Sequence, residues 1–163
     1  MSESRLRSFA SGVLSVLLLQ AALSRAQQLT IQTGTGKPTV LTRANLEALP
    51  RASLTVTASS GNAAYEGVPL KALLEKAGFS FEHLMGKQLA SCLVVEAADG
   101  YRVVIALPEL DPAFGAKQVV LAFLKDGKPL DQKEGPYRVV IPEEKRMARW
   151  VRQVTTLKMV NVE

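Results

Sequence analysis

Apolar and polar residues alternate along several short stretches of this chain, which is the pattern of half-buried β-strands. Turns are predicted between these stretches at 33–38, 59–62, 99–100 and 126–127, the last two being Asp-Gly pairs, which favour hairpins. Gly135-Pro136 is expected to introduce a final pair of strands. The predicted strands span residues 28–32, 40–41, 53–58, 89–97, 101–107, 119–124, 137–141 and 152–160, with a further short one after Gly127.

Helical spacing is clearest in the segment that follows Pro69. Its apolar residues lie at 70, 73, 74 and 77, Pro69 suits the first helical position, and Gly78 suits the C-terminal cap. A shorter helix is predicted at 43–49, because Thr42 can cap it and Pro50 ends it. Single helical turns are expected at 79–85 and 108–114.

Short strands thus dominate, and helices interrupt them without the regular alternation of a doubly wound fold. No internal repeat is present. The sequence therefore predicts the α+β class, with mixed or antiparallel β-sheets and two or three short helices.

The first 26 residues have the composition of a signal peptide. Arg5 and Arg7 precede a short apolar core at 13–23, and small residues follow at the expected cleavage site after Ala26. This core is shorter than the roughly 20 apolar residues that span a bilayer, although an uncleaved N-terminal anchor is the alternative. We expect residues 27–163 to form a single domain that is periplasmic or secreted, with no membrane span after signal cleavage.

The charge of the predicted mature chain is mild. The first 26 residues hold three arginines and one glutamate, so residues 27–163 hold 17 Lys or Arg and 14 Asp or Glu, a net charge of +3. A nucleic-acid-binding protein would have a denser basic face, and we predict no nucleic-acid partner.

Cys92 is the only cysteine and is expected to be a buried, inert thiol. His83 is the only histidine, which argues against a histidine-based metal site or a catalytic triad.

The cations that remain of interest are concentrated between residues 134 and 152. An apolar strand-like run is followed there by Pro142 and a basic segment that contains Trp150, the only tryptophan. One interpretation is a solvated basic turn between two strands. The other is a recess for an anion, because guanidinium groups recognise phosphate and carboxylate in a fixed geometry. The cations are Arg138, Lys145, Arg146, Arg149 and Arg152.

No common catalytic motif is present. The GTGK segment at 34–37 lacks the earlier glycine and the following Ser or Thr of a phosphate-binding loop. Glu143 and Glu144 are adjacent in sequence, so they are interpreted as partners of the neighbouring cations rather than as a catalytic pair. We therefore assign no catalytic residue.

Six segments in order resemble the molybdopterin-binding domain of sulfite-oxidase-type oxidoreductases: LTRANLEALP, TVT, YEGVPLKALLEKAG, DGYRVVIALPEL, DGKPL and EGPYRVVIPEEKRMARWVRQVTTLKM. The resemblance extends from about residue 39 to 160, and the last segment is the most specific. It implies the mixed α+β fold of that family, with the basic segment facing the phosphate of the pterin. The cofactor-binding residues that it implies are Asn62, Tyr101, Arg138, Lys145, Arg146 and Arg149.

One departure from the family concerns the metal. Ser59 stands at the position of the cysteine that ligates molybdenum in catalytic members, and a hydroxyl is a far poorer ligand than a thiolate. Cys92 belongs to a later strand and cannot replace it. Arg5 and Arg7 are separated by Leu6, so the signal resembles the general secretory type rather than the twin-arginine type, and such a chain is exported without a cofactor.

Two functional hypotheses follow. The first is an exported protein of this family that lacks the metal-ligating thiolate and binds a small anionic ligand or an exported protein partner, with no cofactor expected. The second is an active molybdopterin-dependent oxidoreductase or a subunit of one, since molybdopterin is possible by resemblance. In both, Trp150 is expected to be buried, with Arg149 and Lys145 at the rim of the recess.

Overall fold

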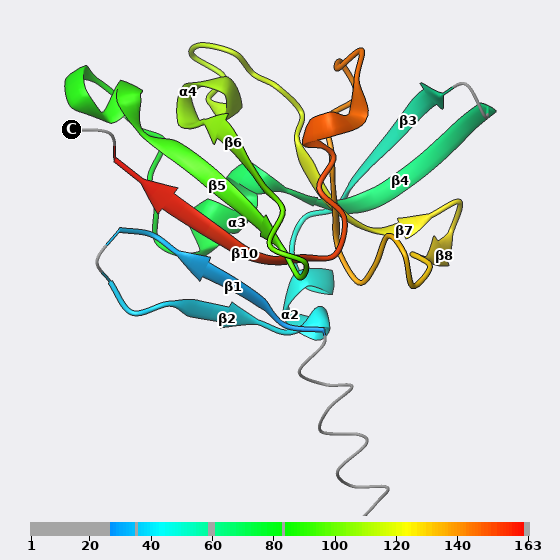
Figure 1. Ribbon diagram of the computed structural model, residues 1–163. Helices are drawn as coiled ribbons and strands as arrows, with labels where there is room; N and C mark the ends of the chain where they lie inside the picture. Colours follow the sequence, from blue (N-terminus) through cyan, green and yellow to red (C-terminus); the bar gives the residue numbers. More distant parts are fainter. Residues whose placement is uncertain (1–26, 35, 59–60, 83, 162–163) are drawn as a thin grey trace, which may run out of the picture.

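The computed structural model describes residues 27–34, 36–58, 61–82 and 84–161. Its strands form two five-stranded sheets, here called sheet A and sheet B (Figure 1). Sheet A contains parallel and antiparallel pairs, whereas the pairs of sheet B are antiparallel. The α+β class with mixed sheets, predicted from the sequence, is confirmed.

Sheet A has the strand order β2-β1-β10-β5-β6. β1 (Leu29–Gln32) is antiparallel to β2 (Thr39–Leu41) and parallel to β10 (Val154–Val160). The first and last strands of the described chain are therefore neighbours in this sheet. On the other side of β10 lie β5 (Cys92–Ala97) and β6 (Arg102–Ala106), which form the predicted hairpin.

Sheet B has the order β3-β4-β7-β8, and β9 pairs with β7 as well. The hairpin of β3 and β4 extends away from the rest of the domain at the upper right of Figure 1. The strands of this sheet are β3 (Ala52–Ala58), β4 (Gly61–Pro69), β7 (Val120–Lys125), β8 (Lys128–Pro129) and β9 (Arg138–Val140).

The helices are short. α2 (Arg43–Glu47) is capped by Thr42, whose hydroxyl accepts a hydrogen bond from the Asn45 N–H at 3.3 Å. α3 (Leu70–Lys76) buries the three leucines that its spacing predicted, with Pro69 one position earlier than expected, as the N-cap. α4 (Leu107–Leu110) is a single turn, as expected for 108–114. Two 3-10 helices, η1 (Gly86–Ala90) and η2 (Met147–Arg149), complete the described elements.

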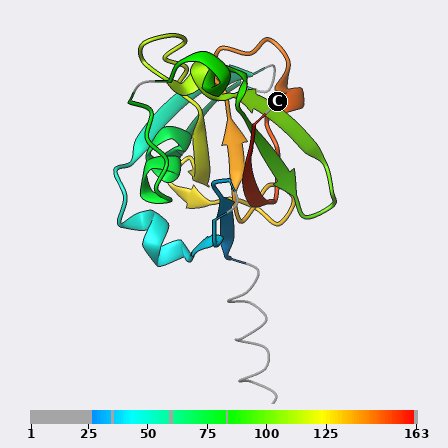
Figure 2. The same cartoon turned by 90° about the vertical axis from the view of Figure 1, so that its left-hand side faces the viewer.

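One cluster of buried hydrophobic residues joins both sheets and α3. Figure 2 shows α2 and α3 on one side of the domain and the β5–β6 hairpin on the other. Trp150 belongs to this cluster and is 5% exposed, so its predicted burial is confirmed. Trp150 thus attaches the C-terminal end of the basic segment to the core.

Four expectations about local structure were wrong. Residues 61–69 form a strand that was not predicted, and residues 79–85 contain no helical turn among those described, with His83 outside the described residues. The last two strands are not partners: β9 pairs with β7, whereas β10 lies between β1 and β5. Cys92 is half-buried rather than buried, since it lies at the start of β5 beside Ala106 and Val160.

Candidate functional site

Two adjoining pockets lie around Arg138 and share Glu134, Arg138, Met147 and Trp150 in their walls. The larger has a volume of about 630 Å³ and the smaller of about 330 Å³. We call them together the Arg138 recess. The larger pocket is completed by the β5–β6 hairpin and the segments at 133 and 151–153, and the smaller by the β3–β4 hairpin and the turn after β7. The other lining residues are Val56, Gly61, Asn62, Ala63, Tyr65, Ala97, Asp99, Tyr101, Lys125, Asp126, Lys133, Ala148, Val151, Arg152 and Gln153.

Arg138 is the central cation of this recess and is only 7% exposed. It lies on β9 within an apolar run, which brings its guanidinium between two aromatic rings. The guanidinium carbon is 5.4 Å from the Trp150 ring centre and 5.7 Å from that of Tyr65, and these two rings meet edge to face at 6.0 Å. Aromatic faces attract such a cation, so the rings fix its position.

The hydrogen bonds of the Arg138 guanidinium leave part of it free. Nη1 donates to the Tyr65 hydroxyl at 3.3 Å and pairs with the Glu134 carboxylate. Nε is buried and has no hydrogen-bond partner among the described residues. Buried polar groups usually have a partner, and an unsatisfied donor costs about 1 to 3 kcal/mol. Nε is enclosed, so an acceptor in the recess would bind at Nη2, which makes no hydrogen bond to the described residues.

The carboxylates around the recess are all engaged. Glu134 pairs with Arg138 and lies 3.6 Å from Lys125 Nζ. Asp99 accepts the Tyr101 N–H at 2.9 Å, and Asp126 accepts the Ala64 N–H at the same distance. Two cations of the wall are different, because within the described part of the chain they form no ion pair and are exposed: Lys133 and Arg152.

Two other predicted site residues also lie at the recess. Tyr101 is 49% exposed, and its hydroxyl donates to the Ala148 carbonyl at 2.8 Å, which links the β5–β6 hairpin to the basic segment. Asn62 lies in the wall of the smaller pocket and accepts a hydrogen bond from the Thr57 hydroxyl at 2.9 Å. The structure thus brings Asn62, Tyr101 and Arg138 around one recess.

The remaining predicted cations lie elsewhere. Lys145 and Arg146 are exposed and are not among the residues that line the recess. Arg149 also lies outside these walls, in contrast to its expected place at the rim. Its Nε donates to Glu144 at 2.6 Å, while Nη1 donates to the Val104 carbonyl at 3.3 Å and is 3.5 Å from Glu109. Arg149 therefore connects the basic segment to β6 through Val104 and to α4 through Glu109.

The Glu109 carboxylate accepts hydrogen bonds from Lys117, from the Ala106 N–H and from Arg149. Burial raises the pKa of Glu109, but these three donors outweigh burial and leave the pKa below its ordinary value. Because the pKa is lower in the folded than in the unfolded state, the ionised form stabilises the fold above the unfolded pKa of 4.5. This stabilisation is lost as the pH falls through the lower, folded pKa.

We therefore expect Glu109→Gln to lower the free energy of unfolding at pH 7 by about 1 kcal/mol. The same variant should lose less stability than the unchanged protein between about pH 5 and pH 3. Urea unfolding across this pH range measures both effects. Glu82→Gln is the control, since Glu82 is exposed and forms no ion pair in the part of the chain that is described. Parallel pH profiles for Glu109→Gln and the unchanged protein would contradict this role.

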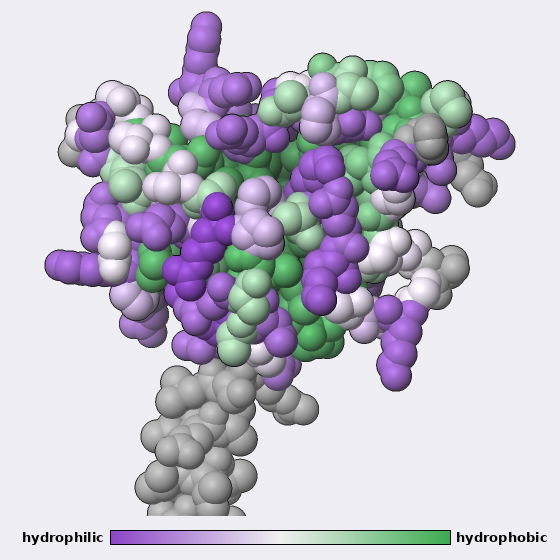
Figure 3. Space-filling view, turned by 180° about the vertical axis from the view of Figure 1, so that it is seen from behind, coloured by the Kyte–Doolittle hydropathy of each residue, from purple (hydrophilic) through white to green (hydrophobic). Residues whose placement is uncertain are grey.

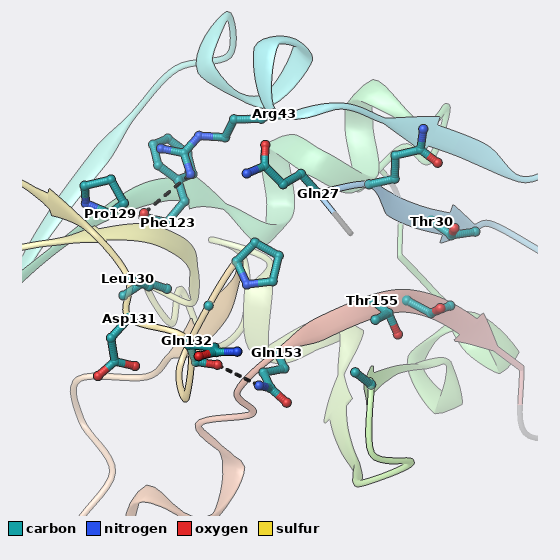
Figure 4. A pocket seen from close by; sticks show the side chains of 15 residues that line it. Gln27, Thr30, Arg43, Phe123, Pro129, Leu130, Asp131, Gln132, Gln153 and Thr155 are labelled. Atoms are coloured by element: carbon teal, nitrogen blue, oxygen red, sulfur yellow. Dashed lines mark hydrogen bonds between the residues drawn. The ribbon is translucent and has the colours of Figure 1, made fainter. Parts of the chain in front are cut away.

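A third pocket, of about 640 Å³, lies between β1 and β10 on one side and the segment at 129–136 on the other (Figure 4). Its polar lining consists largely of glutamine and threonine side chains, and Gln153 separates it from the Arg138 recess because it lines both. The Arg43 guanidinium covers the Phe123 ring at 4.0 Å. None of the residues predicted as a site from the sequence lines this pocket.

Sequence reasoning missed several residues of the recess, among them Tyr65, Lys133 and Glu134. One signal was available for Glu134. An arginine inside the apolar run at 137–141 needs a counter-charge, and Glu134, four residues earlier, is the nearest acidic residue before that run. Tyr65 gave no signal, because its approach to Arg138 depends on the pairing of β4 with β7.

The described residues offer no group of three or more His, Cys, Asp or Glu side chains that could hold a metal ion. Ser59, the position of the family's metal-ligating cysteine, and His83 lie outside the described residues. Cys92 begins β5, whereas Ala97 at the other end of that strand lines the recess. The only thiol of the chain is thus five residues of extended strand, about 17 Å, from the recess. The Arg138 guanidinium in the recess is a group that pairs with anions such as phosphate or carboxylate.

The exposed large hydrophobic residues include two of the recess, Tyr101 and Met147. Seen from behind, the surface mixes hydrophilic and hydrophobic residues, with hydrophobic ones gathered at its upper right (Figure 3). No helix among the described residues is long and apolar enough to cross a membrane.

Three comparisons with known proteins bear on this geometry. Residues 19–163 match the family model described as the oxidoreductase molybdopterin binding domain. The fold is similar to that of the sulfane dehydrogenase SoxCD from Paracoccus pantotrophus, with a TM-score of 0.66 and 24% sequence identity over 84% of this chain. The chain spans 39% of the length of that relative, so the likeness concerns the fold of one part. Comparison with curated proteins gave no significant match.

Proposed function

This chain belongs to the oxidoreductase molybdopterin-binding domain family, and we propose that it is an exported member that binds a small anionic ligand in the Arg138 recess. The resemblance to sulfite-oxidase-type domains that the sequence predicted is confirmed by the family match. Export to the periplasm, the ligand and the lack of the metal-ligating thiolate belong to the proposal. A carboxylate or phosphate on an exported protein partner is a ligand of the same chemistry.

The observation that carries the proposal is the buried guanidinium of Arg138. It lies in the wall shared by the two pockets, and Nη1 makes both of its hydrogen bonds to described residues, which leaves Nη2 for an anion in the recess. An oxyanion can accept from guanidinium N–H groups in two places at once. Lys133 and Arg152 add positive charge at the larger pocket and attract an anion towards it.

Trp150 provides a direct measurement of binding, because it is the only tryptophan and lines both pockets. We expect inorganic phosphate or sulfate to change its fluorescence in a saturable way. The double variant Lys133→Gln/Arg152→Gln should weaken this binding about tenfold, which corresponds to about 1.4 kcal/mol. Both side chains are exposed, so the fold is expected to tolerate the change.

Lys145→Gln/Arg146→Gln is the matched control, because it removes two exposed cations of the same basic segment that do not line the recess. This control should bind phosphate as the unchanged protein does. Absence of a saturable response in the unchanged protein, or a larger loss in the control than in the recess variant, would reject the proposal.

The family match also supports a second candidate, an active molybdopterin-dependent oxidoreductase or a subunit of one. The phosphate of the pterin would then be the anion at Arg138. Molybdenum analysis of protein recovered from its own periplasm, after growth with ample molybdate, distinguishes the two candidates. Stoichiometric molybdenum would overturn the cofactor-free proposal, and its absence would reject the second candidate. The intact mass of the same material tests removal of residues 1–26.

A further inference from the structure

One edge of sheet B is formed by β3, which has β4 on one side and no other strand among the described residues on the other. Its pairing with β4 is regular over seven residue pairs, without a register shift. Proteins usually protect such an edge with a charged residue, a proline or a bulge. β3, with the sequence ASLTVTA, has none of these. Its hairpin also projects from the domain (Figure 1), and Ser53, Thr55 and Thr57 are exposed.

The hydrogen-bond directions along β3 follow from its neighbour. The N–H and C=O of Ala64 on β4 both bond to Asp126, at 2.9 and 2.7 Å, and so point away from β3. Ala64 lies opposite Thr55. This pair is therefore a non-hydrogen-bonded pair, and the N–H and C=O of Thr55 point to the free edge. Because the pattern alternates along a strand, the same groups of Ser53 and Thr57 point there too.

The sequence of β3 is nearly the same in both directions around Thr55. Two positions away from Thr55 there is a hydroxyl residue on each side, Ser53 and Thr57. One position away there is a branched apolar residue on each side, Leu54 and Val56. The side chains of Ser53, Thr55 and Thr57 are exposed on one face, and those of Leu54 and Val56 are buried on the other. A strand of this kind matches an antiparallel copy of itself, because each residue then meets a residue of its own class.

We propose that β3 pairs antiparallel with β3 of a second copy of this chain, about a two-fold axis at Thr55. Thr55 then lies opposite Thr55 of the partner, and Ser53 opposite Thr57 of the partner. The three outward-pointing residues of each copy exchange six interchain hydrogen bonds. Leu54 lies beside Val56 of the partner, so the buried face continues across the two sheets. A slip of one residue would turn the apolar side chains to the wrong face. A slip of two residues keeps the faces but loses the match of Ser53 with Thr57 and of Leu54 with Val56.

This dimer is independent of the ligand proposed for the Arg138 recess. It can be tested by sedimentation equilibrium of the purified protein over a range of concentrations, where a reversible dimer is expected. The variant Ser53→Lys/Thr57→Lys places lysine opposite lysine at two positions of the interface, and should weaken association about tenfold or more. The variant Ser53→Lys/Thr57→Glu places lysine opposite glutamate at the same two positions, and should associate at least as well as the unchanged protein.

The two double variants form a matched pair, because they change the same residues and differ only in the sign of one charge. Circular dichroism confirms that each is folded. Thr55→Pro is a second probe, since it removes the central N–H from the free edge. A monomer at all concentrations, association of the lysine–lysine variant equal to that of the unchanged protein, or equal weakening of both double variants would overturn the proposal.

Discussion

Trp150→Ala is expected to lower the free energy of unfolding by about 3 to 5 kcal/mol. The side chain is 5% exposed, and its indole N–H donates to the Ile141 carbonyl at 2.9 Å. Its ring also contacts Tyr65 edge to face and makes a cation–π contact with the Arg138 guanidinium. Alanine would leave a cavity between the core and the recess, and the Ile141 carbonyl would lose its donor. Chemical denaturation followed by circular dichroism measures the loss, because the variant has no tryptophan whose fluorescence could report unfolding.

Two variants control this experiment. Met147→Ala changes a residue of the same segment that is 44% exposed, and should alter stability by no more than about 0.5 kcal/mol. Trp150→Phe retains an aromatic ring but loses the donor, so an intermediate effect is expected. A loss below about 1 kcal/mol for Trp150→Ala would mean that the tryptophan does not hold the recess to the core.

The second large effect is expected for Gly67→Ala. Gly67 lies in β4 at the register shift against β7. A Cβ atom there would lie 2.0 Å from the Leu121 carbonyl oxygen and 2.6 Å from the Ala122 Cα. Both are backbone atoms of a buried strand, so no side chain can rotate to make room. We expect a loss of about 3 kcal/mol or more, or failure to fold, because overpacking must here displace a strand.

Gly36→Ala is the control for this change. A Cβ atom at Gly36 would have the Thr33 carbonyl oxygen as its nearest neighbour, at an ordinary contact distance of 3.8 Å. The control should therefore leave the midpoint of thermal unfolding nearly unchanged. If Gly67→Ala unfolds at the same temperature as Gly36→Ala, then β4 and β7 are farther apart at this point than the structure has them.

The two variants also differ in what they report about the recess. Trp150 forms part of its wall, so Trp150→Ala removes a contact of Arg138 directly. Gly67 is not part of the wall, but it sets the distance between β4, which carries Tyr65, and β7, which carries Lys125. A protein that tolerates neither change needs both the buried Trp150 side chain and the close approach of β4 to β7.

The local elements that the sequence predicted well are those with a strong internal pattern. α3 has apolar residues at helical spacing and three of them are buried, and the β5–β6 hairpin has alternating residues around an Asp-Gly turn. β4 was missed because its residues, GNAAYEGVP, are poor strand formers. It is a strand because β3 and β7 supply hydrogen-bond partners on both sides, which no local pattern reveals.

The candidate site likewise has a part that the sequence predicted and a part that it did not. The sequence marked the basic segment and its tryptophan, and it named Asn62, Tyr101 and Arg138 by resemblance. It could not tell which cations face the recess. Arg149 finds Glu144 and Glu109, and Glu109 comes from α4, 40 residues earlier in the chain. Arg152 was one of the cations that the sequence marked, but nothing distinguished it from Lys145 and Arg146, which do not line the recess. Lys133, which does line it, lies just before the marked stretch.

By itself, the sequence determined the class of fold, the family and the burial of Trp150, because these depend on periodicity, motif order and the size of an apolar side chain. Only the tertiary structure decided that β9 and β10 belong to different sheets. That division places Arg138 between Tyr65 and Trp150 with Glu134 as its partner, and leaves Arg149 in an ion-pair network outside the recess. The physical reason is that the partner of a charge is set by distance in space, and strand pairing between remote segments sets that distance.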